Sequence, residues 1–126
     1  MSKKNDSLKL LEEYKSLFDR IDYYRDMFQN KTYNTPGEFN EALVELTGIY
    51  SSIHPVALNA ETEKLHHEET YKQKKREKMI GLDYEEVTKY RRLRNIFVGA
   101  RDCCEKMMST CQSSLRYLLT ERNYTS

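Results

Sequence analysis

Apolar residues recur along this chain in alternating steps of three and four, the spacing that aligns side chains on one face of an α-helix. Three segments carry the pattern. It falls first on Leu10, Tyr14, Leu17, Ile21, Tyr24 and Phe28, then on Phe39, Leu43, Leu46, Tyr50, Ile53, Ala57 and Ala60, and last on Tyr90, Leu93, Phe97, Ala100, Cys104, Met107, Cys111, Ser114 and Leu118. The pattern predicts three long helices, over residues 7–29, 36 to about 79, and 84–121.

The second segment has the clearest start. Thr35 is placed as the N-cap, Pro36 takes the first helical position, and Glu38 follows three residues after the cap, as in a capping box. Pro55 lies inside the segment, but the apolar phase is kept across it. We therefore expect a kink near residues 51–52 rather than a break.

Beyond Ala60 the apolar seam of the second segment fades. The same phase falls on Lys64, His67, Tyr71, Lys74 and Lys78. This part of the helix is expected to project away from the core and to end at Gly81. A second capping box over residues 83–86, headed by Asp83, predicts the start of the third helix.

Composition favours the same all-α class. Charged residues make up 33% of the 126 residues and hydrophobic residues 38%, against about 25% and 45–50% in a typical domain. Four glycines and two prolines are too few turn residues for a doubly wound enzyme or a β-barrel. We expect one domain over residues 1–126, a helical hairpin or bundle, with one helix in each of residues 1–34, 35–80 and 83–122.

The net charge of +1 hides two blocks of opposite sign. Residues 35–71 hold seven acids and one base, a net charge of −6, and residues 72–94 hold nine bases and four acids, a net charge of +5. Such blocks pair within the chain, pair between subunits, or leave the basic block for a polyanion.

The basic block is a candidate surface for single-stranded nucleic acid. If the chain folds back at Gly81, two groups of cations meet at one end of a helical hairpin, where a tyrosine such as Tyr71 or Tyr84 could stack on a base. The candidate residues are Lys72, Lys74, Lys75, Arg76, Lys78, Arg91, Arg92 and Arg94. Binding of this kind is independent of base sequence. The alternative, a basic end that neutralises the acidic block of a neighbouring subunit, stays open.

The third segment is apolar over more than one stripe, which predicts a homo-oligomer. The candidate interface residues are Phe97, Cys104, Met108, Cys111, Leu115 and Leu118. The three cysteines are odd in number and lie in a helical pattern, so we expect reduced core residues rather than disulfides.

Signatures of catalysis are missing from the sequence, and we expect a protein that is not an enzyme and needs no cofactor or metal. Glu63 and His66 form one E-x-x-H motif, whereas a di-iron bundle needs two copies and two further glutamates. The chain has no apolar run of membrane-spanning length and no signal-peptide core, which predicts a cytoplasmic protein.

The order of features over residues 39–122 resembles the UvsY-type recombination mediators of bacteriophages. The resemblance rests on an apolar helix with Tyr50 and His54, a lysine-rich middle over residues 71–78, and a last helix in which Asp102, Cys103 and Cys104 lead to Ser113, Ser114 and Leu118. It implies an oligomeric helical protein of the host cytoplasm that helps to load a RecA-like recombinase onto single-stranded DNA. The alternative is a helical protein-interaction module, for example a phage factor that binds or inhibits a host or defence protein.

Overall fold

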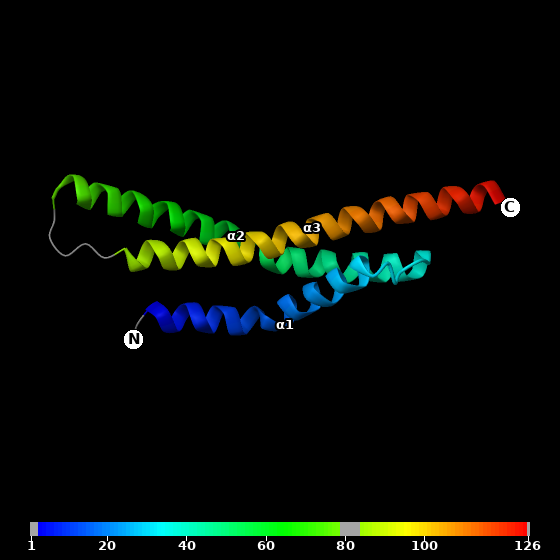
Figure 1. Ribbon diagram of the computed structural model, residues 1–126, viewed down its shortest axis with the longest axis horizontal. Helices are drawn as coiled ribbons and strands as arrows, with labels where there is room; N and C mark the ends of the chain where they lie inside the picture. The colour runs from blue at the N-terminus through cyan, green and yellow to red at the C-terminus, as the bar shows by residue number, and fades with distance from the viewer. Residues whose placement is uncertain (1–2, 79–83, 126) are drawn as a thin grey trace. The chain divides into compact units, whose positions relative to one another are not determined.

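The structure, a computed structural model, describes residues 3–78 and 84–125 (Figure 1). It contains three helices, α1 (Lys3–Gln29), α2 (Pro36–Arg76) and α3 (Glu85–Thr125). No strand occurs within the described ranges. The predicted all-α class with a helical hairpin is confirmed, and α2 continues through Pro55 without a break.

The capping box predicted at the start of α2 is present. The backbone N–H of Glu38 donates to Thr35 Oγ1 at 3.3 Å, and the N–H of Thr35 donates back to Glu38 Oε1 at 3.1 Å. The Thr35 hydroxyl also donates to Glu38 Oε1 at 2.8 Å, and this bond, with those from the N–H groups of Asn34 at 3.2 Å and Thr35, holds the pKa of Glu38 below its usual value. The first turn of α2 is therefore fixed by local sequence alone.

α1 ends in a Schellman motif that the sequence pattern did not reveal. The N–H of Thr32 donates to the carbonyl of Met27 at 3.0 Å, and the N–H of Lys31 donates to the carbonyl of Phe28 at 3.2 Å. Lys31 has the left-handed φ of 52° that this motif needs, where glycine is usual. The helix end is therefore made at some conformational cost.

α2 ends earlier than its predicted limit. Its last helical residue is Arg76, and Lys78 adopts a left-handed φ of 55° while its N–H donates to the carbonyl of Lys75 at 3.1 Å. The chain thus leaves the helix at a lysine rather than at a glycine. The predicted helix end at Met79, the stop at Gly81 and the cap at Asp83 lie outside the described residues.

The chain forms two compact units. The three-helix unit contains α1, residues 36–51 of α2 and residues 102–125 of α3. Its buried residues are Ile21, Tyr24, Phe39, Ala42, Leu46, Ile49, Cys104, Met107 and Cys111. Most of them are positions of the predicted heptad seams, so the seams do form this core.

A polar network joins α1 to α2 in the three-helix unit. Arg20 donates two hydrogen bonds to the carboxylate of Glu45, from Nε at 2.6 Å and Nη2 at 2.8 Å, and Tyr24 OH donates to the same carboxylate at 2.6 Å. Burial, helped by Glu45, raises the pKa of Tyr24 to about 12. The bidentate pair fixes how α1 lies along α2.

The two-helix unit contains residues 52–76 of α2 and residues 85–101 of α3, which run antiparallel and side by side (Figure 1). Its buried residues are Ile53, Ala57, Ala60, Val87, Leu93, Phe97 and Val98. The prediction that α2 projects away from the core beyond Ala60 is wrong for residues 64–71. Lys64, His67 and Tyr71 are half-buried, and this part of α2 still packs on α3. Polar and aromatic contacts continue the helix pairing where apolar residues stop.

Candidate nucleic-acid interface

All eight predicted nucleic-acid-binding cations belong to the two-helix unit. Lys72, Lys74, Lys75 and Arg76 lie in the last turns of α2, and Lys78 follows the helix. Arg91, Arg92 and Arg94 lie in the first half of α3. Antiparallel pairing of the helices places both groups in the same unit, as the folded-back chain predicts.

Two of the three predicted cations of α3, Arg91 and Arg94, are paired with carboxylates of α2, whereas Arg92 is exposed. Arg91 Nη2 donates to Glu68 Oε2 at 3.0 Å, and Lys64 Nζ lies 3.5 Å from the other oxygen of that carboxylate. The hydrogen bond from Arg91 is the main reason why the pKa of Glu68 is lowered. Arg94 Nη2 lies 3.6 Å from Glu61 Oε1. Two of the eight predicted cations, Arg91 and Arg94, are therefore paired with Glu68 and Glu61 of the acidic block.

The last turns of α2 differ from this part of α3. Lys72 approaches Glu69 at 3.9 Å, a long and exposed contact. Four cations at this end are exposed and form no ion pair with any described residue: Lys74, Lys75, Arg76 and Lys78. The neighbouring acid, Glu77, accepts a hydrogen bond from Gln73 at 3.4 Å. Cations are also favourable here because a helix C-terminus carries partial negative charge. The end of α2 thus presents net positive charge to solvent.

Aromatic rings of the two-helix unit lie beside cations of α3. The rings of Tyr71 and Tyr84 meet edge to face, with centroids 4.8 Å apart, and the Arg91 guanidinium lies 5.3 Å from the centre of the Tyr84 ring. Tyr90 stacks on His67 with centroids 4.3 Å apart. Tyr84 is 41% exposed, whereas Tyr71 and Tyr90 are half-buried. Of these tyrosines, Tyr84 is the one most open to solvent.

The predicted oligomer-interface residues divide into two groups. Phe97, Cys104 and Cys111 are completely buried by the chain itself, so a second copy cannot reach them in this conformation. Burial raises the pKa of Cys104 to about 12 and that of Cys111 to about 11, which keeps both thiols protonated. The remaining candidates are half-buried on α3: Met108, Leu115 and Leu118.

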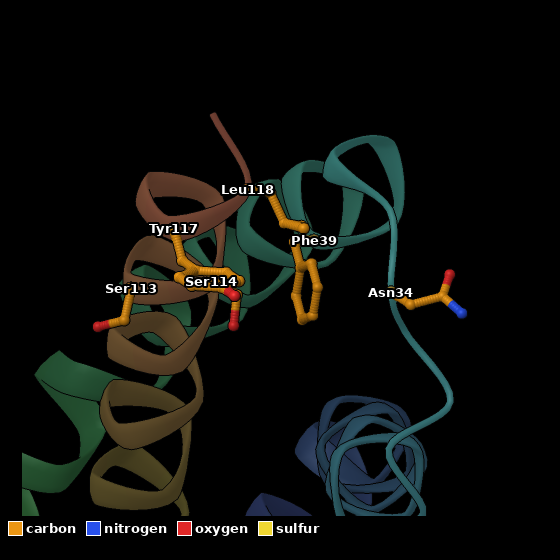
Figure 2. Close-up of a pocket in the computed structure, with 6 residues that line it drawn as sticks. All are labelled: Asn34, Phe39, Ser113, Ser114, Tyr117 and Leu118. Atoms are coloured by element: carbon orange, nitrogen blue, oxygen red, sulfur yellow. The ribbon is translucent and has the colours of Figure 1, made fainter. Parts of the chain in front are cut away.

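An apolar pocket lies at the end of the three-helix unit. Figure 2 shows Tyr117, Ser114 and Leu118 of α3 on one side and Phe39 of α2 facing them, with Asn34 farther out. The cavity has a volume of about 350 Å³. Tyr117 and Leu119 beside it are 66% and 51% exposed. This end of α3 therefore keeps apolar surface in contact with solvent.

The E-x-x-H motif is engaged in local contacts. His67 Nε2 lies 3.6 Å from Glu63 Oε2, and the ring of His66 contacts the ring of His67. In the described part of the chain, no group of three or more histidine, cysteine or acidic side chains is arranged to hold a metal ion. Nor is any helix in that part both long and apolar enough to cross a membrane.

Comparison with known protein families, characterised proteins and solved structures finds no match to this chain. The function of the chain is therefore inferred from the surfaces described above. Two of them are candidates for binding, the cationic end of α2 and the apolar pocket beside Tyr117.

Proposed function

We propose that this protein binds single-stranded DNA without sequence preference through the end of α2. In this proposal it is a non-enzymatic accessory protein of phage type for DNA recombination or replication, and it assists the loading of a recombinase. The observation that carries the proposal is the exposed run of Lys74, Lys75, Arg76 and Lys78, which has no acidic partner among the described residues.

The ion pairs within the chain favour a polyanion over a neighbouring subunit as the partner of this run. Glu61 and Glu68 are engaged by cations of α3, and Glu45 by Arg20. Three of the seven acids of the block that would attract a second copy are thus already paired with arginines. A phosphate backbone supplies regularly spaced charge and releases counterions on binding.

The chemistry of the run suits contact with phosphates rather than with base edges. Three of its four cations are lysines, which act as flexible point charges, and all four are exposed on one helix end. Contacts of this kind position a protein on nucleic acid but carry no sequence information. Affinity for strands of different sequence but equal length is therefore expected to be similar.

The test is replacement of Lys74, Lys75 and Arg76 together by Ala. A control triple variant, Lys9→Ala, Lys106→Ala and Arg116→Ala, removes the same charge from exposed positions of the three-helix unit. The first variant should weaken binding to a fluorescent oligothymidylate at least tenfold, an order of magnitude set by about three lost phosphate contacts. Equal weakening by the two variants would overturn the assignment of the site, because it would show an effect of net charge only.

Assembly of several copies is part of this proposal. Leu115 and Leu118 are half-buried and Leu119 is exposed at the end of α3, so a second copy that covers them removes apolar surface from water. A closed arrangement of copies would leave no such end uncovered. Several cationic ends in one particle would then act on the same strand.

The second candidate function is that of a helical protein-interaction module, which the pocket of Phe39, Tyr117 and Leu118 favours. An apolar hollow beside exposed aromatic surface suits the side chain of a protein partner. If this second function is the right one, wild-type protein should fail to bind an oligonucleotide of several tens of nucleotides at low salt. Binding at low salt, lost in the triple variant of α2, would contradict it.

A further inference from the structure

We infer that Tyr84 is a base-stacking residue of this interface, the element that makes it prefer single strands to duplexes. The inference rests on the proposed function, since it concerns strands held by the cations of α2. The sequence offers both Tyr71 and Tyr84 as stacking residues, and their exposure in the folded chain favours Tyr84.

Tyr84 is held in place by contacts on both helices. Its ring meets that of Tyr71 from α2 at 4.8 Å, and the Arg91 guanidinium lies 5.3 Å from its centre. Arg91 is itself fixed by Glu68 at 3.0 Å. The backbone carbonyl of Tyr84 accepts the first hydrogen bond of α3, from Thr88 N–H at 3.1 Å. A ring ordered before binding loses little conformational entropy when a base stacks on it.

Exposure separates Tyr84 from the other tyrosines of the two-helix unit. Tyr84 is 41% exposed, while Tyr71 is half-buried and Tyr90 is covered by the parallel ring of His67. A base approaching from solvent therefore meets Tyr84. The role of Tyr71 is then to position Tyr84.

The charges around Tyr84 orient the strand. The first turn of α3 is acidic, with Glu85 and Glu86 directly after Tyr84, whereas the last turn of α2 is basic. The acidic first turn of α3 repels phosphates, and the basic last turn of α2 attracts them. A bound strand is expected to run its backbone along the cations of α2 and to turn its bases toward Tyr84. Paired bases in a duplex are not available for such a contact.

The experiment compares three fluorescent probes of one length, an oligothymidylate, an abasic strand with the same backbone, and a duplex. Wild-type protein should bind the oligothymidylate about five- to a hundredfold more tightly than the abasic strand, the range for stacking of one base. Tyr84→Leu should abolish this preference without changing the salt dependence, and Tyr84→Phe should keep it. Tyr23→Leu is the matched control and should change nothing, since Tyr23 is a 39% exposed tyrosine of the other unit with an arginine, Arg20, over its ring.

The outcomes separate this inference from the proposed function. Equal binding of both single strands by wild-type protein, or a preference that survives Tyr84→Leu, would overturn the role of Tyr84 and leave the cationic site standing. Binding of no probe at low salt would overturn both. Circular dichroism of Tyr84→Leu should show unchanged helix content, since the side chain is not part of the buried core.

Discussion

Glu68 of α2 accepts a hydrogen bond from Arg91 of α3 at 3.0 Å, across the two helices of one unit. The same guanidinium lies over the ring of Tyr84. One carboxylate thus neutralises a cation at the surface and holds it beside an aromatic ring. This contact links the acidic block to the basic block within the chain, whereas the cations at the end of α2 are exposed and have no such partner among the described residues.

Glu68→Gln is expected to steepen the salt dependence of single-stranded DNA binding. The substitution removes the charge that holds Arg91 and Lys64, so one or two more cations become available to phosphates. The salt dependence should steepen by about 0.7 in log–log slope for each added phosphate contact. Fluorescence titration at several salt concentrations measures this change, and Glu41→Gln, an exposed acid of the three-helix unit, is the control. An unchanged slope in Glu68→Gln would show that Arg91 does not reach the strand.

Glu45→Gln is expected to destabilise the protein at neutral pH and much less at acidic pH. Arg20 holds the pKa of Glu45 below its usual value of 4.5, so the pair stabilises the fold above that pH. The contribution disappears as the pH falls through the lower pKa of the folded state. Water screens the pair, whose side chains are 45% and 37% exposed, and the effect on the free energy of unfolding at pH 7 is about 1 kcal/mol. Urea unfolding at pH 7 and pH 3 measures it, and a loss of equal size at both would contradict this account.

Lys31→Gly is expected to stabilise the protein by about 0.5–1 kcal/mol. Lys31 has a φ of 52° at the end of α1, a conformation that costs an L-residue energy but not glycine. The greater freedom of glycine in the unfolded chain offsets part of the gain. Lys9→Gly, at an exposed interior position of α1, should instead destabilise by about 1 kcal/mol. Thermal unfolding of both variants tests the opposite signs.

Leu118→Asp is expected to weaken self-association. Leu118 lines the pocket at the end of α3, and a second copy that covers this apolar surface would bury the new carboxylate without a partner. Light scattering at micromolar concentration should show a smaller particle than the wild type. Leu65→Asp is the control, since Leu65 is 55% exposed in the other unit. A wild-type particle with the mass of one chain would contradict the proposed oligomer.

The sequence pattern predicted those features that depend on residues close together in the chain. The heptad steps identified buried positions such as Leu46 and Phe97, and the capping box at Thr35 is formed. The end of α2 could not be predicted in this way, because Lys78 carries no residue-type signal for a left-handed φ. The pair of Glu68 and Arg91 depends on the register of two antiparallel helices, which no single helix pattern contains.

The predicted site residues illustrate the same limit. The eight cations form one block in sequence, but the pairing of the helices brings Arg91 and Arg94 to carboxylates. Lys74, Lys75, Arg76, Lys78 and Arg92 are exposed and have no ion pair with a described residue. The apolar stripes of the third helix could not tell intramolecular core from free surface. The prediction of reduced core cysteines is confirmed for Cys104 and Cys111, and the packing of the chain shows that this core is intramolecular.

The most direct test of the cationic site is the salt dependence of oligothymidylate binding by wild-type protein. If the exposed cations at the end of α2, Lys74, Lys75, Arg76 and the following Lys78, contact phosphates, log affinity should fall linearly with log salt concentration. A slope of about −3 for each engaged copy is expected, from about −0.7 for each neutralised phosphate. No binding at low salt, or binding that does not weaken as salt is added, would contradict the account.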